Sequence, residues 1–203
     1  MGTHRCALVS NAHHGVSPRA LARTAARPYT GRDTKETQLK KRLAPPSISL
    51  LDKYVGDTFQ PLYSTTVRVS GGATAHGRAS GVARSDDGNL ALELRLPGAL
   101  GGPGGGTNPE QLFAAGFAAC FHGALNLLAT KAGIAVADAT VDVAVGFGRD
   151  PVDGLYTLTA DVRIDLPGVP RAIAEDLIRS TERVCPYAKM ARQGIVCVVA
   201  LVR

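Results

Sequence analysis

The chain has 203 residues, of which 45% are hydrophobic and 20% charged, a composition that favours one folded domain and excludes wholesale disorder. No apolar run approaches the roughly 20 residues that span a bilayer, so we expect no transmembrane helix. Only 5% of the residues are aromatic and none is Trp, which argues against a nucleic-acid platform of stacked bases. Four cysteines are too few for a disulfide scaffold.

The net charge of +6 is concentrated at the N-terminus. The first 50 residues carry nine Lys or Arg and two acids, so the remaining residues sum to −1. This segment is rich in Arg, Ala, Ser and Thr and has no sustained apolar period, which is typical of an organelle transit peptide. An inert basic extension and a tether to nucleic acid or membrane are the alternatives. We therefore predict a basic leader or extension over residues 1–55 and one folded domain over 56–203.

The first half of the domain reads as strands followed by one long helix. Strands are predicted over 62–69, 81–85 and 90–96, and the last of these alternates apolar and polar residues. After a glycine-rich loop, Asn108 is a helix N-cap, Pro109 fits the first helical position, and the apolar run continues to about Lys131. Small residues make the middle of this helix slim, so we expect it to be central and buried.

The second half adds two strands, a helix and a final strand. The strands are predicted over 141–147 and 155–166, the helix over 170–184, and a fully buried strand over 195–202. The order of strands, helix, strands, helix and strand favours an α+β fold over a doubly wound one.

The glycine-rich loop over 101–106 does not predict a phosphate site. It lacks the GK[ST] ending of a P-loop, and its spacing also misses the G-x-G-x-x-G fingerprint. The glycines are better explained by tight turning and close approach to a neighbouring backbone.

Two cysteines are candidates for chemistry. Cys120 lies in the middle of the slim helix, and Cys185 ends the second helix directly before Pro186. Both fit the common role of free cysteine as a small buried hydrophobe. A reactive role requires a nearby cation or helix N-terminus that lowers the thiol pKa, and Arg78 and Arg192 are the candidate cations. A third cysteine, Cys197, lies inside the predicted final strand and is expected to be structural.

Four strings together resemble one family. TNPEQLFAAGFAACF covers residues 107–121 and VCPY covers 184–187, with GRASGVARSDDGNL and LGGPGGGTNPE upstream. They resemble the organic hydroperoxide resistance proteins, the Ohr branch of the OsmC/Ohr superfamily, over about residues 62–203. The resemblance implies antiparallel sheets wrapped around a long central helix, in an intertwined homodimer with its sites at the interface.

The resemblance also implies roles for individual residues. Cys120 matches the peroxidatic cysteine, which attacks an organic hydroperoxide and becomes a sulfenic acid, and Cys185 matches the resolving cysteine, which closes a disulfide. Arg78 looks like the arginine that activates the thiolate, with Arg84 as its competitor, and Glu110 looks like the glutamate that holds the arginine. Three further residues match a supporting or pocket role: Arg192, Phe121 and Tyr187.

Helix geometry adds one inference about the assembly. Glu110 and Cys120 are ten residues apart, which is about 15 Å along one straight helix and too far to share a small site. Either the helix breaks or the two residues of one site come from different chains. We therefore expect Cys120 and Cys185 from one chain to meet Arg78 and Glu110 from the other.

The resemblance names the reductant as well. It implies a dihydrolipoyl group on a lipoylated protein, no bound cofactor or metal, and no nucleic-acid partner. The expected location is mitochondrial if the source is eukaryotic and cytoplasmic otherwise. The alternative function is a non-enzymatic dimer of the same fold that binds an apolar ligand.

Overall fold

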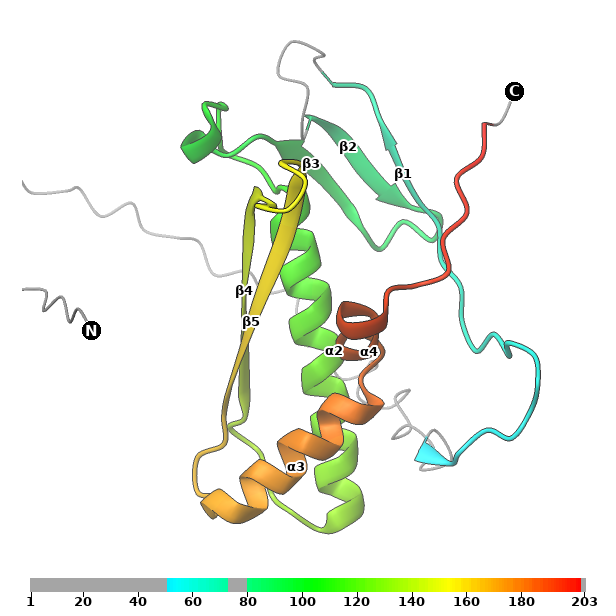
Figure 1. Ribbon diagram of the computed structural model, residues 1–203, viewed down its shortest axis with the longest axis vertical. Coiled ribbons are helices and arrows are strands. Elements are labelled where there is room, and N and C mark those ends of the chain that lie inside the picture. Colours follow the sequence, from blue (N-terminus) through cyan, green and yellow to red (C-terminus); the bar gives the residue numbers. More distant parts are fainter. Residues whose placement is uncertain (1–50, 73–79, 202–203) are drawn as a thin grey trace, which may run out of the picture. The chain divides into compact units, whose positions relative to one another are not determined.

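The computed structural model describes residues 51–72 and 80–201. Contacts divide the chain between Pro45 and Pro46, so every described residue belongs to the second unit. Residues 1–50 of the predicted leader and the candidate Arg78 lie outside the described residues. The element order is β-strands, one long helix, a β-hairpin and two further helices (Figure 1): β1 Val67–Ser70, β2 Ser80–Ser85, β3 Ala91–Arg95, η3 Gly98–Leu100, α2 Pro109–Ala132, β4 Thr140–Arg149, β5 Tyr156–Asp165, α3 Arg171–Val184 and α4 Pro186–Gln193. This order confirms the α+β prediction.

The first sheet is antiparallel, in the order β1-β2-β3. Its inner face carries Ala83 and Leu94, which are buried. The strand β1 begins at Val67, five residues later than predicted, because Val67 pairs with Ser85, the last residue of β2. The Asp86 N–H still donates to the Thr66 carbonyl at 3.0 Å, but the chain then turns, so β2 offers residues 62–65 no strand to pair with.

The second sheet is the antiparallel hairpin β4-β5, in register from Thr140 opposite Asp165 to Arg149 opposite Tyr156. Its turn closes where the Gly154 N–H donates to the Asp150 carbonyl at 2.8 Å. Near the open end of the hairpin, alternate residues pack against the core: Val141, Val143, Val162 and Ile164. Near its turn, Tyr156 and Leu158 are exposed.

The long helix α2 follows the predicted capping chemistry closely. Asn108 and Gln111 form a capping box, and Gly133 ends the helix in the left-handed conformation at φ 67°. Its buried side chains recur every four residues and pack against β4, α3 and α4 (Figure 1): Phe117, Phe121, Leu125 and Ala129. By length and composition α2 could cross a membrane, but this packed stripe is that of a core helix. The helix is central, yet its small-residue face at Ala115, Ala119 and Gly123 is exposed rather than buried.

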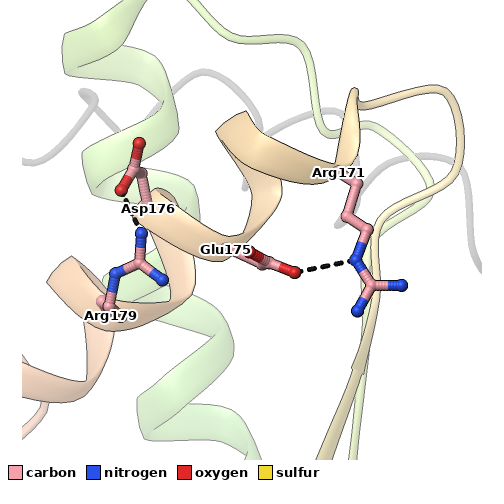
Figure 2. A network of polar contacts seen from close by, with 4 residues as sticks. All are labelled: Arg171, Glu175, Asp176 and Arg179. Carbon is pink, nitrogen blue, oxygen red and sulfur yellow. Dashed lines mark hydrogen bonds and ion pairs between the residues drawn. The ribbon is translucent and has the colours of Figure 1, made fainter.

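The helix α3 is amphipathic, with Leu177 and Thr181 buried against α2. Its outer surface carries two ion pairs (Figure 2): Arg171 with Glu175 at 2.8 Å, and Arg179 with Asp176. The eight-residue helix α4, which the sequence analysis does not predict, begins with Pro186 at its first position.

The prediction of a buried strand over 195–202 is wrong. Residues 195–201 form no helix or strand, and their apolar side chains are 66–99% exposed: Ile195, Val196, Val198, Val199 and Leu201. The apolar pattern is present, but within the described part of the chain neither sheet pairs with this segment. Cys197 is consequently exposed, which also contradicts its expected structural role.

Candidate functional site

The fold brings Cys120 and Cys185 together across 65 residues of sequence. The Cys185 thiol donates to the Cys120 sulfur, and the two Sγ atoms lie 3.6 Å apart. Cys185 is fully buried, whereas Cys120 is half-buried on α2. Two free thiols at this separation need to approach by only about 1.5 Å to form a disulfide.

Cys185 is fixed from both sides by helix ends. Its N–H donates to the Thr181 carbonyl at 2.8 Å, which makes it the C-cap of α3. Its own carbonyl accepts from the Lys189 N–H at 3.0 Å, the first hydrogen bond of α4. The residue therefore occupies a two-helix corner, where its extended backbone (φ −68°, ψ 117°) directs the side chain toward α2.

The pKa of Cys120 is raised above its ordinary value. Burial is the main cause, since it penalises the thiolate, and the neighbouring Cys185 adds to the effect. The backbone N–H of Tyr187 acts in the opposite direction, because it donates to the Cys120 sulfur from the first turn of α4. The described residues alone therefore favour the protonated thiol, and a further cation is needed for reactivity at neutral pH.

The candidate cations lie in three different situations. Arg78 is outside the described residues. Arg84 is exposed on β2, where it pairs in register with Arg68 and Ala91. Arg192 is engaged by Glu182: one guanidinium nitrogen lies 2.6 Å from the Glu182 carboxylate, and the other donates to the Glu182 backbone carbonyl at 3.0 Å.

Glu110 lies in the first turn of α2, and the helix continues without a break through Cys120. The first of the two alternatives, a broken helix, is therefore removed. Within one chain Glu110 stays about 15 Å from Cys120 along the axis.

Aromatic rings cover the stretch of α2 that precedes Cys120. Tyr187 packs against Phe113 and Phe117 with ring centroids 6.3 Å and 5.9 Å away. These rings and Cys120 adjoin the same apolar core that buries Cys185. The predicted pocket residue Tyr187 thus lies beside the thiols, on the start of α4.

A hollow of about 300 Å³ lies on another side of the same core. Phe121, the other predicted pocket residue, forms part of its wall, and Glu182 and Arg192 contribute polar groups. The rest of the wall is apolar and comes from α2, β5, α3 and α4: Phe117, Ala160, Val162, Ile164, Ile178, Ala188 and Ala191. Phe117, Phe121 and Ala188 belong to the same buried cluster as Cys185, so the hollow and the thiol pair adjoin one core.

Among residues 51–72 and 80–201, no group of three or more His, Cys, Asp or Glu side chains is placed to hold a metal ion. The sequence analysis did not identify Glu182 as a functional residue. Two features of the sequence could have pointed to it: Glu182 lies three residues before Cys185, and Pro186 has no N–H to donate to the Glu182 carbonyl.

Comparison with known proteins bears on this arrangement. Residues 102–200 match the family model for OsmC-like protein. The Organic hydroperoxide resistance protein of Xanthomonas axonopodis pv. citri is 42% identical over 125 residues, which cover 61% of this chain and 87% of the relative. A crystal structure of an organic hydroperoxide resistance protein from Elizabethkingia anophelis, with crystallant-derived thiocyanate bound, is 38% identical with a TM-score of 0.59 and covers 66% of this chain and 92% of that one. A corresponding structure from Legionella pneumophila is 36% identical with a TM-score of 0.59, at 66% and 93% coverage.

Proposed function

This chain belongs to the organic hydroperoxide resistance family of OsmC-like proteins, and we propose from that premise that it is a thiol peroxidase that reduces organic hydroperoxides. The observation that carries the proposal is the 3.6 Å separation of the Cys120 and Cys185 sulfurs, one half-buried and the other fully buried. A half-buried thiol is open to substrate, and a buried neighbour is poised to capture its oxidised form.

In the first step the Cys120 thiolate attacks the terminal oxygen of the hydroperoxide. The O–O bond breaks, the alkoxide takes a proton and leaves as the alcohol, and Cys120 becomes a sulfenic acid. The sulfur loses two electrons and the peroxide gains them.

In the second step the Cys185 sulfur attacks the sulfenic sulfur of Cys120. The S–S bond forms, the S–O bond breaks, and the departing hydroxide takes the Cys185 proton to become water. The net reaction converts one hydroperoxide and two thiols into an alcohol, water and a disulfide.

A cation is required to keep Cys120 ionised against the effect of burial. We propose Arg78 for this role, held by Glu110, because a guanidinium next to a thiolate lowers its pKa and can also donate to the peroxide oxygens. A glutamate suits the second role, since it fixes the guanidinium fork by bidentate pairing.

The apolar surroundings of the thiols favour an apolar substrate. The half-buried rings of Phe113 and Tyr187, which pack together beside the thiols, offer surface for a hydrocarbon chain, which hydrogen peroxide lacks. We therefore propose alkyl or lipid hydroperoxides as the substrate class.

For turnover the disulfide must be reduced, and we propose a dihydrolipoyl group on a lipoylated protein as the donor. No bound cofactor enters this scheme. The basic leader and a mitochondrial location would place the enzyme beside lipoylated dehydrogenase complexes, and both remain predictions.

We also propose that the working form is an intertwined homodimer. The apolar segment 195–201 is exposed in the single chain, and so is the small-residue face of α2 at Ala115, Ala119 and Gly123. A second copy would cover such surfaces. It would also bring Glu110 of one chain toward Cys120 of the other, which an unbroken α2 prevents within one chain.

The test is consumption of cumene hydroperoxide and of a fatty-acid hydroperoxide by the purified full-length protein. We expect turnover with dihydrolipoamide, little with thioredoxin or glutathione systems, and none in Cys120→Ser. Cys197→Ser is the matched control, because it removes an exposed thiol outside the pair.

Absence of turnover, together with slow alkylation of both paired thiols in the folded protein, would reject the peroxidase. It would favour the alternative of a dimer that binds an apolar ligand, for which the hollow beside Phe121 is the candidate site.

A further inference from the structure

We propose that Arg192 and Glu182 form a clamp that holds Cys185 within reach of Cys120, so that the clamp sets the rate of disulfide formation. The proposal rests on the peroxidase function above and assigns a positioning role to the pair. Neither residue takes part in the chemistry.

The clamp supplies a hydrogen bond that the backbone cannot make. In a continuing helix the Glu182 carbonyl would accept from the N–H of residue 186, but that residue is Pro and has no N–H. Arg192 takes the place of this donor, since its guanidinium donates to the carbonyl at 3.0 Å. A positive charge at the C-terminus of α3 is also favourable for the helix dipole.

The same guanidinium holds the Glu182 side chain. Its second nitrogen lies 2.6 Å from the carboxylate, so one planar group binds the last turn of α3 at two points. Glu182 precedes Cys185 by three residues, and Arg192 lies in the last turn of α4. The two bonds therefore close a loop of chain that contains the two-helix corner and Cys185 itself.

Disulfide formation is sensitive to the position of this corner. The sulfur of Cys185 must reach the sulfenic sulfur of Cys120, form the S–S bond and release water, starting from the 3.6 Å contact. Misplacement by about 1 Å can slow a positioned reaction on the order of a hundredfold. A clamp that keeps α4 folded back on α3 restricts the movement of the corner and so keeps the Cys185 sulfur in position.

The clamp is expected to affect rate more than stability. The side chains of Arg192 and Glu182 are 44% and 52% exposed, and ion pairs in such positions contribute little to folding. The first step uses only Cys120 and its activating cation, so its rate is expected to be independent of the clamp.

Four variants of the full-length protein separate these effects. Arg192→Ala removes both bonds, Arg192→Lys keeps the charge without the planar fork, and Glu182→Gln keeps the backbone bond but loses the ion pair. The matched control is Arg179→Ala, which breaks the exposed pair with Asp176 on the same helix (Figure 2).

Reduced protein is mixed with one equivalent of cumene hydroperoxide, quenched at intervals with dimedone, and analysed by mass spectrometry. In Arg192→Ala we expect conversion of sulfenic acid to the Cys120–Cys185 disulfide on the order of tenfold slower, with dimedone-trapped Cys120 accumulating. The first step, followed as loss of the free Cys120 thiol, should proceed in Arg192→Ala at the wild-type rate. Glu182→Gln should show a smaller delay, Arg192→Lys should recover part of the rate, and Arg179→Ala should match wild type.

Two outcomes would overturn the clamp: an unchanged second step in Arg192→Ala, or a first step slowed in the same proportion. A second assay uses diamide, a thiol oxidant that needs no hydroperoxide chemistry, and follows closure of the same disulfide. If wild type fails to consume hydroperoxide, the peroxidase proposal fails alone. If diamide then forms the Cys120–Cys185 disulfide at the same rate in wild type and Arg192→Ala, the clamp proposal is rejected on separate grounds.

Discussion

The ring of Tyr187 lies directly against the backbone of Gly116. A Cβ at Gly116 would be 2.9 Å from the Tyr187 hydroxyl oxygen and 3.3 Å from the nearest ring carbons. Gly116 is one helical turn before Cys120, and Tyr187 is two residues after Cys185. The absence of a side chain at Gly116 therefore allows the start of α4 to approach α2 where the two sulfurs meet.

Replacing this glycine should slow disulfide formation. Alanine in a helix interior is ordinarily more stable than glycine by about 1 kcal/mol, but in Gly116→Ala the methyl group must displace the Tyr187 ring. We expect most of that gain to be lost and closure of the Cys120–Cys185 disulfide to be slower. Denaturant unfolding and the dimedone-trapping assay measure the two effects.

Gly123→Ala is the matched control for this substitution. It lies on the same helix, and among the described residues of the single chain a Cβ at Gly123 would meet no packing neighbour within 4 Å. Because the proposed second copy would cover this face of α2, the comparison is restricted to the Cys120–Cys185 disulfide within one chain, and we expect Gly123→Ala to leave its formation unchanged. Equal behaviour of the two alanine variants would show that the contact with Tyr187 is unimportant.

Local chemistry explains why α2 could be predicted within one residue at its C-terminus. Asn108, Pro109 and Gly133 act on neighbouring backbone groups, and so their effect is visible in sequence. The eight-residue α4 is too short for a clear apolar period, although Pro186 at its start and Gly194 at its end were available signals.

Features that depend on distant partners were not predictable in the same way. The segment 195–202 has the apolar pattern of a buried strand, but pattern alone cannot say which strand would pair with it. The proximity of Cys120 and Cys185 was implied by the family resemblance, since a separation of 65 residues carries no geometric information. The clamp between Glu182 and Arg192 was missed because it requires the corner between α3 and α4.

Removing the activating cation should reveal the effect of burial on Cys120. In Arg78→Ala we expect the pKa of Cys120 to lie above its ordinary value, because burial then acts without an opposing charge. The pH profile of Cys120 alkylation by iodoacetamide should move to higher pH relative to wild type. Arg84→Ala is the control, and a shift in that variant alone would assign the role to Arg84.

The same raised pKa has a consequence for stability. In Arg78→Ala the folded state retains the Cys120 proton at pH values where the unfolded chain has lost it. The contribution of the retained Cys120 proton to the free energy of unfolding is therefore present below pH 9.0, the ordinary thiol pKa. It is lost as the pH rises above that value. Unfolding free energies between pH 8 and pH 10 should fall in Arg78→Ala more steeply than in Arg78→Ala/Cys120→Ser, and parallel curves would contradict the assignment.

Charge on the exposed C-terminal segment should weaken the dimer. Val196 and Val198 are 99% and 85% exposed in the single chain, and an interface would bury them. We expect Val196→Asp/Val198→Asp to raise the dimer dissociation constant on the order of tenfold or more, measured by analytical ultracentrifugation. Val152→Asp, at the 91% exposed turn of the β4-β5 hairpin, is the control that should leave association unchanged.

A mixed dimer decides whether each site draws on both chains. One chain carries Cys120→Ser and the other Arg78→Ala, and each homodimer is expected to be inactive. If Cys120 of one chain works with Arg78 of the other, the mixed dimer keeps one site with both residues intact. It should then show about half the wild-type activity per dimer, since one of two equivalent sites remains.

If each site lies within one chain, both sites of the mixed dimer lack a required residue and activity should be absent. Differently tagged chains, purified in tandem, keep the homodimers out of the assay. The unbroken α2 separates Glu110 from Cys120 within a chain, so we expect the first outcome. A mixed dimer of Cys120→Ser with Cys185→Ser is the counterpart: both thiols belong to one chain, where their sulfurs lie 3.6 Å apart, so this pairing should form no Cys120–Cys185 disulfide.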